Sequence, residues 1–318
     1  MQAALYERYG SADVVQLREV DSPRPRGGEL LVSVQAAALN PKDVVIRSGR
    51  FRAVSGTRFP KFIGCDLVGR VVGVGWRAPT AFAGARVFGF YTGTRALRGS
   101  VADLAAIATD QVCVIPRVLD PIAAAATPLA GSTALQALRD DARLQAGQHV
   151  LIVGASGGVG TFAVQIAKLL GARVTASASA ANAELVRSLG ADEVLDHGSD
   201  APLGHGPYDA VLDCYGRLRA RHAGSVLARH GRFVTLVPSR GIFRDIALAR
   251  LHLPRTVPTV LTSVEPRARD LAQLAGWLGT GKLKPVIDSI YPRAQLHEAM
   301  LRLETRHARG KIIVSLED

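Results

Sequence analysis

The sequence predicts an α/β protein in which a β-rich first part is followed by a doubly wound parallel sheet. In roughly the first 120 residues, short apolar runs are separated by clusters of Pro and Gly, a spacing typical of a compact barrel or sandwich. These runs are residues 30–34, 67–74 and 111–115. Further along, apolar strands alternate with helical segments, which indicates βαβ units. The 318 residues are enough for two domains of ordinary size.

The second part can be divided into elements from its apolar periodicity. An alanine-rich helix is expected first, over residues 123–138. The elements that follow are a strand over 149–153, a helix that stops at Gly171, a strand over 173–178, a helix over 183–189, strands over 193–195 and 209–212, a helix over 219–229 and a strand over 232–237. Residues 287–290 and 311–316 are expected to form closing strands.

Composition excludes several classes of protein. Hydrophobic residues make up 48% and charged residues 21%, which excludes a disordered chain. No run approaches about 18 apolar residues, the length that a transmembrane helix needs. The start of the chain alternates polar and apolar residues, unlike a signal peptide. Cys65, Cys113 and Cys214 lie far apart and form no CxxC, so we expect a protein of the reducing cytoplasm.

The net charge of +12 comes mainly from arginine. Residues 214–269 contain eleven arginines and only two acids, Asp245 and Glu265. One interpretation is a solvated, arginine-rich surface. Another is attraction of an anionic ligand, namely cofactor phosphates, a carrier-linked substrate or RNA. Aromatic residues are only 5% of the chain and do not alternate with these arginines, which argues against a nucleic-acid partner.

A glycine-rich loop predicts a phosphate site. The strand over 149–153 runs into Gly154-Ala155-Ser156-Gly157-Gly158-Val159-Gly160, and an apolar helix follows. Free N–H groups and the dipole at a helix N-terminus favour a bound anion. Gly157 and Gly158 let a diphosphate approach the backbone, and Gly160 lets the helix pack on the strand. We therefore expect residues 156–160 to bind a dinucleotide; a tight turn without a ligand is the alternative.

The end of the next strand favours NADP(H) over NAD(H). NAD-binding folds place an acid on the ribose 2′-hydroxyl about 20 residues after the glycine loop. Here the strand over 173–178 ends without an acid, and no carboxylate occurs before Glu184. A 2′-phosphate would therefore not be repelled. The side chains that could receive it are Ser177, Ser179, Asn182 and Arg187.

Several further motifs accompany the loop. They are Asn40-Pro41-Lys42-Asp43, Arg47-Ser48-Gly49, residues 64–69 and 128–134, the loop with its helix over 154–165, Leu189-Gly190-Ala191-Asp192 and Arg309-Gly310-Lys311. Together they resemble the medium-chain dehydrogenase/reductase superfamily, and within it the zinc-independent, zeta-crystallin-like NADPH:quinone oxidoreductase branch. The resemblance covers nearly the whole chain.

The resemblance implies a GroES-like β-rich domain and a Rossmann domain, with NADPH in the cleft between them. The GroES-like domain would span residues 1–121 and be completed by 289–318, and the Rossmann domain would span 122–288. Dimers are common in this family, with an edge strand expected near residues 242–248.

The resemblance also implies that no metal is bound. Zinc-dependent relatives have Cys where this chain has Asn40 and His where it has Cys65, and they carry a four-cysteine lobe that is absent here. A catalytic zinc needs three protein ligands, which Cys65 alone cannot supply. We expect all three cysteines to be core residues. The eight histidines include no closely spaced pair.

Catalytic residues follow from the resemblance only in part. Asn40 and Asp43 would line the nicotinamide side, and Thr127 would lie near the carboxamide. Because Asn-Pro and Asp also favour turns, a purely structural role for this motif is the alternative. Tyr91 is a candidate proton donor or else a partly buried core tyrosine, and solvent is another proton source. Relatives often carry a tyrosine where this chain has Val45.

Two further cofactor contacts are candidates. Lys311 would reach the cofactor phosphates, or else be a charge that extends from a terminal strand to solvent. His197 stands where relatives carry a tyrosine near the 2′-phosphate.

The substrate contacts are expected to be Phe51, Arg240 and Phe243. The segment 239–244 follows a strand's carboxyl end, where α/β sheets place ligands, and it could form a flap.

The expected function is NADPH-dependent hydride transfer to a quinone or an α,β-unsaturated carbonyl compound. One alternative is an enoyl-thioester reductase of a biosynthetic pathway, for which the arginine-rich region would attract the substrate. An alternative of another class is a nucleotide- or RNA-binding protein of the same fold with little turnover.

Overall fold

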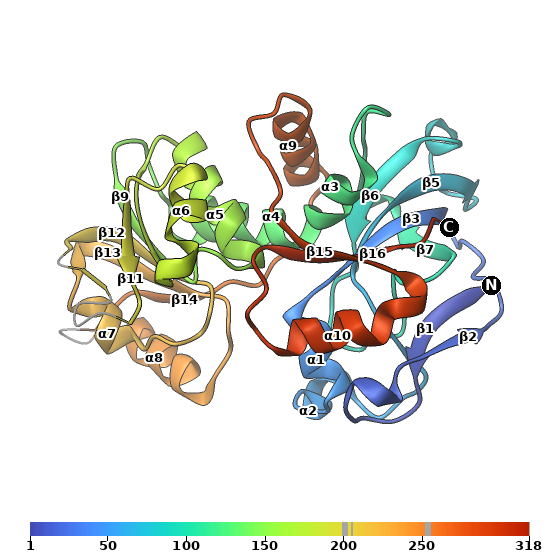
Figure 1. Cartoon of the computed structure of the whole chain (residues 1–318), viewed down its shortest axis with the longest axis horizontal. Helices are drawn as coiled ribbons and strands as arrows, with labels where there is room; N and C mark the ends of the chain where they lie inside the picture. The colour runs from blue at the N-terminus through green and yellow to red at the C-terminus, as the bar shows by residue number, and fades with distance from the viewer. Residues whose placement is uncertain (199–202, 205, 252–255, 318) are drawn as a thin grey trace. The chain divides into compact units, whose positions relative to one another are not determined.

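The computed structural model describes residues 1–198, 203–204, 206–251 and 256–317 (Figure 1). The chain divides into two compact units, the first made of residues 1–132 with 265–318 and the second of residues 133–264. These limits differ from the division expected from the sequence. Helix α3 (Pro121–Ala126) packs on strands β3 (Glu29–Leu39) and β5 (Asp66–Val74) of the first unit, and α9 (Ala268–Gly279) packs on β8 (Val112–Val114).

The first unit is built around a seven-stranded sheet. Its order is β15-β16-β3-β5-β6-β8, and β7 pairs with β3 off this path. The strands not yet given are β6 (Arg86–Phe90), β7 (Leu104–Ala108), β15 (Ile287–Pro292) and β16 (Lys311–Ser315). A smaller sheet has the order β2-β1-β4 and consists of β1 (Gln2–Tyr6), β2 (Gln16–Glu19) and β4 (Lys61–Phe62).

The C-terminal segment belongs to the core of this first unit. Strand β16 runs antiparallel to β3, with Ile312 opposite Leu39. Helix α10 (Leu296–Glu304) lies beside α1 (Pro41–Arg47), as Figure 1 shows. Four side chains of α10 are buried in one cluster with Tyr6 of β1, namely Leu296, Ala299, Met300 and Leu303. Residues near both ends of the chain therefore fix the same body.

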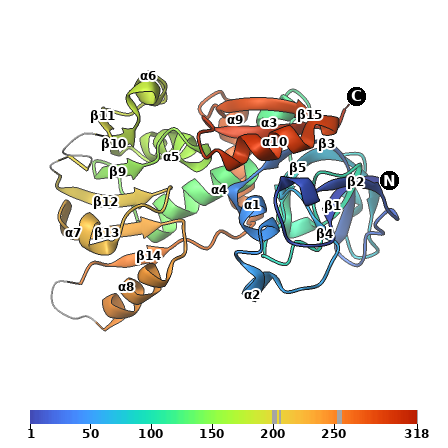
Figure 2. The same ribbon diagram turned by 60° about the horizontal axis from the view of Figure 1, so that its bottom comes forward.

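The second unit is a parallel six-stranded sheet with the order β11-β10-β9-β12-β13-β14 (Figure 2). The strands are β9 (His149–Val153), β10 (Arg173–Ala178), β11 (Glu193–Asp196), β12 (Tyr208–Asp213), β13 (Leu227–Thr235) and β14 (Thr259–Leu261). Counted within the unit, this is the order 3-2-1-4-5-6 of a dinucleotide-binding fold, which confirms the doubly wound parallel sheet. The strand order reverses between β9 and β12, where such sheets bind ligands.

The helices of the second unit connect its strands. They are α5 (Gly158–Leu169), α6 (Ala183–Ser188), α7 (Ala220–Gly224) and α8 (Arg240–Arg250). The core on one side of the sheet contains buried side chains of β9, β12 and β13 together with α7 and Ile242 of α8. No helix among the residues described is long and apolar enough to cross a membrane.

Three sequence expectations differ from the structure. The single helix expected over 123–138 is two helices, α3 and α4 (Pro128–Gln136), because Pro128 interrupts the hydrogen bonding between them. The helix expected over 219–229 ends at Gly224, since β13 begins at Leu227. The edge strand expected near 242–248 is wrong: these residues lie in α8, and the edge strands of the sheet are β11 and β14.

His149 makes the stability of the second unit depend on pH. Its Nε2 lies 2.8 Å from Thr175 Oγ1, and its ring packs edge-on against Tyr208 with centroids 4.7 Å apart. Burial, aided by the Arg173 charge, lowers the pKa of His149 below its ordinary 6.5. The unfolded chain therefore takes up this proton more readily, and stability is lost as pH falls through 6.5 towards the folded pKa.

We expect the free energy of unfolding to fall between pH 7 and 5 by less in His149→Gln than in the unchanged protein. Urea titrations at several pH values measure this. If the free energy of unfolding changes equally with pH in the two proteins, the proposed role of His149 is contradicted.

Candidate functional site

The glycine loop of the second unit presents unpaired N–H groups. Gly154 adopts φ +77°, a conformation that suits glycine, and the Ala155 N–H donates to the Ser177 carbonyl at 3.2 Å. The first hydrogen bond within α5 runs from Thr161 N–H to the Gly157 carbonyl. The N–H groups of residues 158–160 therefore have no acceptor inside the helix and are available to an anion.

Gly160 and Gly157 are required in the loop for different structural reasons. A Cβ at Gly160 would stand 2.1 Å from the Gly154 carbonyl oxygen, so only glycine allows α5 to approach the end of β9 so closely. A Cβ at Gly157 would meet only that same oxygen, at 3.4 Å. Gly157 is thus open on its other sides, as a loop that receives a diphosphate requires. The residues present fit a dinucleotide.

Asn182 connects the loop to the end of β10. Its Nδ2 donates to Ser156 Oγ at 3.1 Å, which brings together two residues that the sequence predicted separately. Its Oδ1 is buried without a hydrogen-bond partner within the described ranges. A buried acceptor of this kind is costly unless a donor reaches it. A hydroxyl of a bound ribose is a donor of the right type.

The remaining candidates surround the end of β10. Ser177 is buried, Ser179 is half-buried, and Arg187 is exposed on α6. His197 is exposed, and its N–H donates to the Ala178 carbonyl at 3.1 Å. Asp196, which no sequence motif marks, pairs with Ala178 in the sheet. The structure brings these residues to one edge, and their predicted contacts with a 2′-phosphate stay predictions.

A buried carboxylate shapes the neighbouring loop where the strand order reverses. Asp213 ends β12 and accepts N–H bonds from Tyr215, Gly216 and Leu218 at 2.8–3.0 Å. Burial raises its pKa. A Cβ added at Gly154 would lie 3.2 Å from the Tyr215 Cβ, so this loop borders the glycine loop. An acid that ends an apolar strand was the sequence signal for Asp213.

Replacing Gly160 with Ala tests the loop. The added methyl would collide with backbone atoms, so the start of α5 must move away. The N–H groups of residues 158–160, which we call the glycine cradle, then lose their positions. We expect Gly160→Ala to weaken NADPH binding at least about tenfold, which is about 1.4 kcal/mol. Fluorescence titration with NADPH measures the binding. The control is Gly276→Ala, because a Cβ on that helical glycine has nothing within 4 Å. Equal affinities in the two variants would contradict this account.

The first unit contains a buried network around Lys311. The Lys311 ammonium donates to Asn40 Oδ1 at 2.6 Å, to the Leu39 carbonyl at 3.2 Å and to Asp66 Oδ2 at 3.3 Å. Asn40 Nδ2 also donates to Asp66, at 2.9 Å. The other carboxylate oxygen of Asp66 accepts the Leu129 N–H at 2.6 Å. Lys311 and Asp66 are 3% and 0% exposed.

This network changes the interpretation of Lys311. The side chain neither extends to solvent nor has a donor to spare for a cofactor phosphate, because each of its three N–H groups has an acceptor. In this structure Lys311 neutralises Asp66 and holds the Asn40 amide. The sequence signal was present, since an acid between Cys65 and Leu67 in a buried strand requires a cationic partner.

Asp43 and Cys65 form a second buried pair. Asp43 Oδ2 accepts the Asn40 N–H at 2.8 Å, and the Cys65 thiol donates weakly to Oδ1 at 3.7 Å. Burial raises the pKa of Asp43, against the opposing effects of the Asn40 N–H and the Lys42 charge. Burial also raises the pKa of Cys65, so it stays a thiol. Asn40 and Asp43 are thus held rigidly together at the start of α1.

Two other candidates use their hydroxyl groups within the fold. Thr127 is buried and donates to the Ala123 carbonyl at 2.8 Å. Tyr91 donates to the Ala106 carbonyl at 3.0 Å, and burial raises its pKa. Of the two interpretations left open for Tyr91, these contacts favour the core tyrosine.

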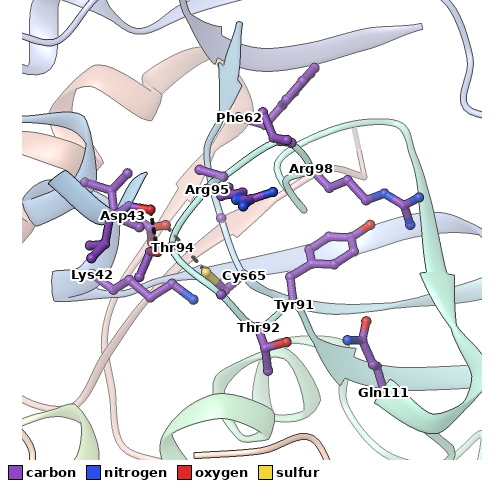
Figure 3. A pocket seen from close by; sticks show the side chains of 16 residues that line it. Lys42, Asp43, Phe62, Cys65, Tyr91, Thr92, Thr94, Arg95, Arg98 and Gln111 are labelled. Carbon is purple, nitrogen blue, oxygen red and sulfur yellow. Dashed lines mark hydrogen bonds between the residues drawn. The ribbon is translucent and has the colours of Figure 1, made fainter. Parts of the chain in front are cut away.

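A cavity of about 470 Å³ opens in the first unit beside Cys65 (Figure 3). It is lined by Lys42, Asp43, Ile46, Val54, Phe62, Gly64, Cys65, residues 91–98 and Gln111. Phe51, which precedes helix α2 (Arg52–Ser55), does not line it, although Val54 of that helix does. Arg240 and Phe243 begin α8 in the second unit, where Phe243 is 57% exposed. Lys42 and Arg95, which line the cavity, were missed because no local pattern marks them.

Breaking the Lys311 network tests its structural role. Lys311→Met would leave the Asp66 carboxylate buried without a cation, so we expect a loss of about 3 kcal/mol in the free energy of unfolding. Denaturant unfolding of the purified protein measures it. The double variant Lys311→Met/Asp66→Asn should recover part of this loss. A single variant as stable as the unchanged protein would rule the network out as a determinant of stability.

The residues around Cys65 do not fit a zinc ion. Among the described residues no group of three or more His, Cys, Asp or Glu side chains is placed to hold a metal. The neighbours of Cys65 include the Lys42 ammonium, which repels a cation. Cys113 and Cys214 are partly buried free cysteines, so the expectation of three core cysteines holds fully only for Cys65.

Comparison with known proteins agrees with both units. The family described as "Alcohol dehydrogenase GroES-like domain" matches residues 26–117, and "Zinc-binding dehydrogenase" matches residues 189–314. The chloroplast envelope quinone oxidoreductase homolog of Arabidopsis thaliana is 34% identical over 99% of this chain and 98% of its own. An NADPH-dependent alkenal/one oxidoreductase of the same plant is 33% identical over 99% of this chain and 79% of its own.

A solved structure extends the similarity to the whole fold. The quinone oxidoreductase from Coxiella burnetii superposes with a TM-score of 0.90 at 29% identity, covering 100% of this chain and 99% of its own.

Proposed function

The chain belongs to the medium-chain dehydrogenase/reductase superfamily, in its quinone oxidoreductase branch, and from this we propose that it transfers hydride from NADPH to a quinone or an α,β-unsaturated carbonyl compound. The observation that carries the proposal is the glycine cradle, in which the N–H groups of residues 158–160 have no acceptor inside α5 and the buried Asn182 Oδ1 has no partner among the described residues. Quinone and alkenal/one are the acceptors in the names of the similar proteins.

The preference for the phosphorylated cofactor rests on charge. Between the end of β10 and Asn182 there is no carboxylate, whereas Ser177, Ser179 and Arg187 offer donors and a positive charge. A carboxylate there would bind the ribose hydroxyl of NADH and repel a 2′-phosphate. We therefore propose NADP(H) as the cofactor.

Residues of this chain would bind and orient the cofactor and the acceptor. NADPH supplies the hydride when it is bound. The glycine cradle orients the diphosphate, and the apolar wall of the cavity in the first unit holds the acceptor and excludes water. Lys42 at the cavity wall would stabilise negative charge that develops on the acceptor oxygen. Solvent supplies the proton that completes the two-electron reduction.

Cofactor kinetics test this function. We expect NADPH oxidation in the presence of benzoquinone, phenanthrenequinone or a 2-alkenal, with kcat/KM for NADPH well above that for NADH. Arg187→Ala should raise KM for NADPH about tenfold, because a charge-assisted hydrogen bond to phosphate is lost. KM for NADH should stay the same.

Arg173→Ala is the matched control, since Arg173 is an exposed arginine at the opposite end of β10. Preference for NADH in the unchanged protein would contradict the cofactor proposal. Turnover only with crotonyl-CoA would favour an enoyl-thioester reductase instead.

We propose in addition that the protein acts as a homodimer in the cytoplasm. Strand β14 pairs only with β13 in the part of the chain that is described, and an unpaired edge of this kind suits association with a second copy. Sedimentation equilibrium tests whether the protein is a dimer, and cell fractionation tests whether it is cytoplasmic.

A further inference from the structure

The cavity of the first unit has an excess of positive charge. Its lining contains three cationic side chains, Lys42, Arg95 and Arg98, and a single carboxylate, Asp43. That carboxylate already accepts hydrogen bonds from the Asn40 N–H and the Cys65 thiol. The charges of Lys42 and Lys311 also act on Asp43. The lining itself therefore carries more cations than carboxylates.

Arg98 and Arg95 differ in their partners. Arg98 forms an ion pair with Glu29 at 2.6 Å and donates to the Ala106 carbonyl at 2.9 Å. Arg95 has no carboxylate partner among the residues described. Figure 3 shows its guanidinium between Phe62 and Tyr91, beside the cavity. Arg95, unlike Arg98, is therefore a lining cation that no carboxylate of the described residues neutralises.

The backbone around Arg95 is fixed by hydrogen bonds. The Lys61 ammonium, completely buried, donates to the Arg95 carbonyl at 2.8 Å and to the Ser55 carbonyl at 2.7 Å. The Phe62 N–H donates to the Ala96 carbonyl at 2.8 Å. Because the segment is tied to both α2 and β4, little backbone entropy is lost when Arg95 binds a ligand.

Part of the cavity lining is apolar. Ile46, Val54, Phe62 and Leu97 all line the cavity. Such a surface suits the ring or alkenyl body of an acceptor. A planar guanidinium in the same lining matches a carboxylate or sulfonate with two parallel hydrogen bonds.

We propose that the preferred acceptor carries an anionic group, and that Arg95 is the specificity-determining residue that binds this group. The proposal rests on the reductase function proposed above and names the class of acceptor. The positive excess attracts the acceptor, the apolar wall holds its unsaturated body, and the Arg95 guanidinium pairs with its carboxylate or sulfonate.

A matched pair of enones tests the proposal. (E)-3-Benzoylacrylate and its methyl ester have the same carbon skeleton around the reducible double bond; the ester lacks the negative charge and is intrinsically the more electrophilic, so the informative quantity is how each variant changes the acid-to-ester ratio. We expect this ratio of kcat/KM values, measured with saturating NADPH, to be about tenfold lower in Arg95→Met than in the unchanged protein, the loss of one charge-assisted contact. The KM for the acid should rise more than kcat falls.

Arg52→Met is the matched control. Arg52 is an exposed arginine on the neighbouring helix α2 and does not line the cavity. Removing its charge should leave the acid-to-ester ratio as it is in the unchanged protein. Thermal unfolding of both variants shows whether they fold alike. An acid-to-ester ratio that is unchanged in Arg95→Met, or that falls equally in the two variants, would overturn the proposal.

A binding measurement separates this inference from the reductase function. Calorimetry with 3-benzoylpropionate, the saturated acid, does not depend on turnover. If neither enone is reduced, the proposed function fails, and the binding measurement alone decides the inference. Binding that weakens in Arg95→Met but not in Arg52→Met supports an anion site in the cavity. Equal binding by all three proteins contradicts it.

Discussion

The ion pair of Lys311 with Asp66 holds the first unit together. Two opposite charges that are almost completely buried are stable only while each compensates the other. Lys311 is the first residue of β16, and Asp66 is the first residue of β5. The Asn40 amide contacts both, and Asn40 is the residue between the end of β3 and the start of α1. Three segments far apart in the sequence therefore meet in one hydrogen-bonded group. The position of Asp43, and through it the Cys65 thiol, depends on that group because Asp43 binds the Asn40 N–H.

The two units use buried carboxylates in similar ways. Asp66 begins a strand in the sheet of the first unit, and Asp213 ends a strand in the sheet of the second. Asp66 accepts the Leu129 N–H, and Asp213 accepts N–H groups of the loop that follows it. In the second unit this fixes the loop beside Gly154, and in the first it fixes the helix that begins at Pro128. The loop that Asp213 fixes borders the glycine cradle, whose N–H groups at residues 158–160 have no acceptor inside α5.

Much of the fold could be predicted from the sequence because it rests on local patterns. The apolar runs at β9 and β10 and the glycine loop specify strand, turn and helix within a few residues. Contacts between distant residues left no such pattern: the partners of Lys311 lie more than 240 residues earlier in the chain, so its buried network could not be predicted from local sequence. Residues 242–248 were misplaced because a resemblance, rather than their own helical periodicity, suggested a strand.

In the proposed reaction the hydride passes directly from NADPH to a carbon atom of the acceptor. The most direct measurement uses NADPH with deuterium at one or the other C4 position of the nicotinamide, in separate reactions with an enone. Mass spectrometry and NMR of the product locate the label. The account predicts deuterium at the β-carbon from one of the two labelled cofactors and unlabelled product from the other. Deuterium at the β-carbon from neither cofactor would contradict it.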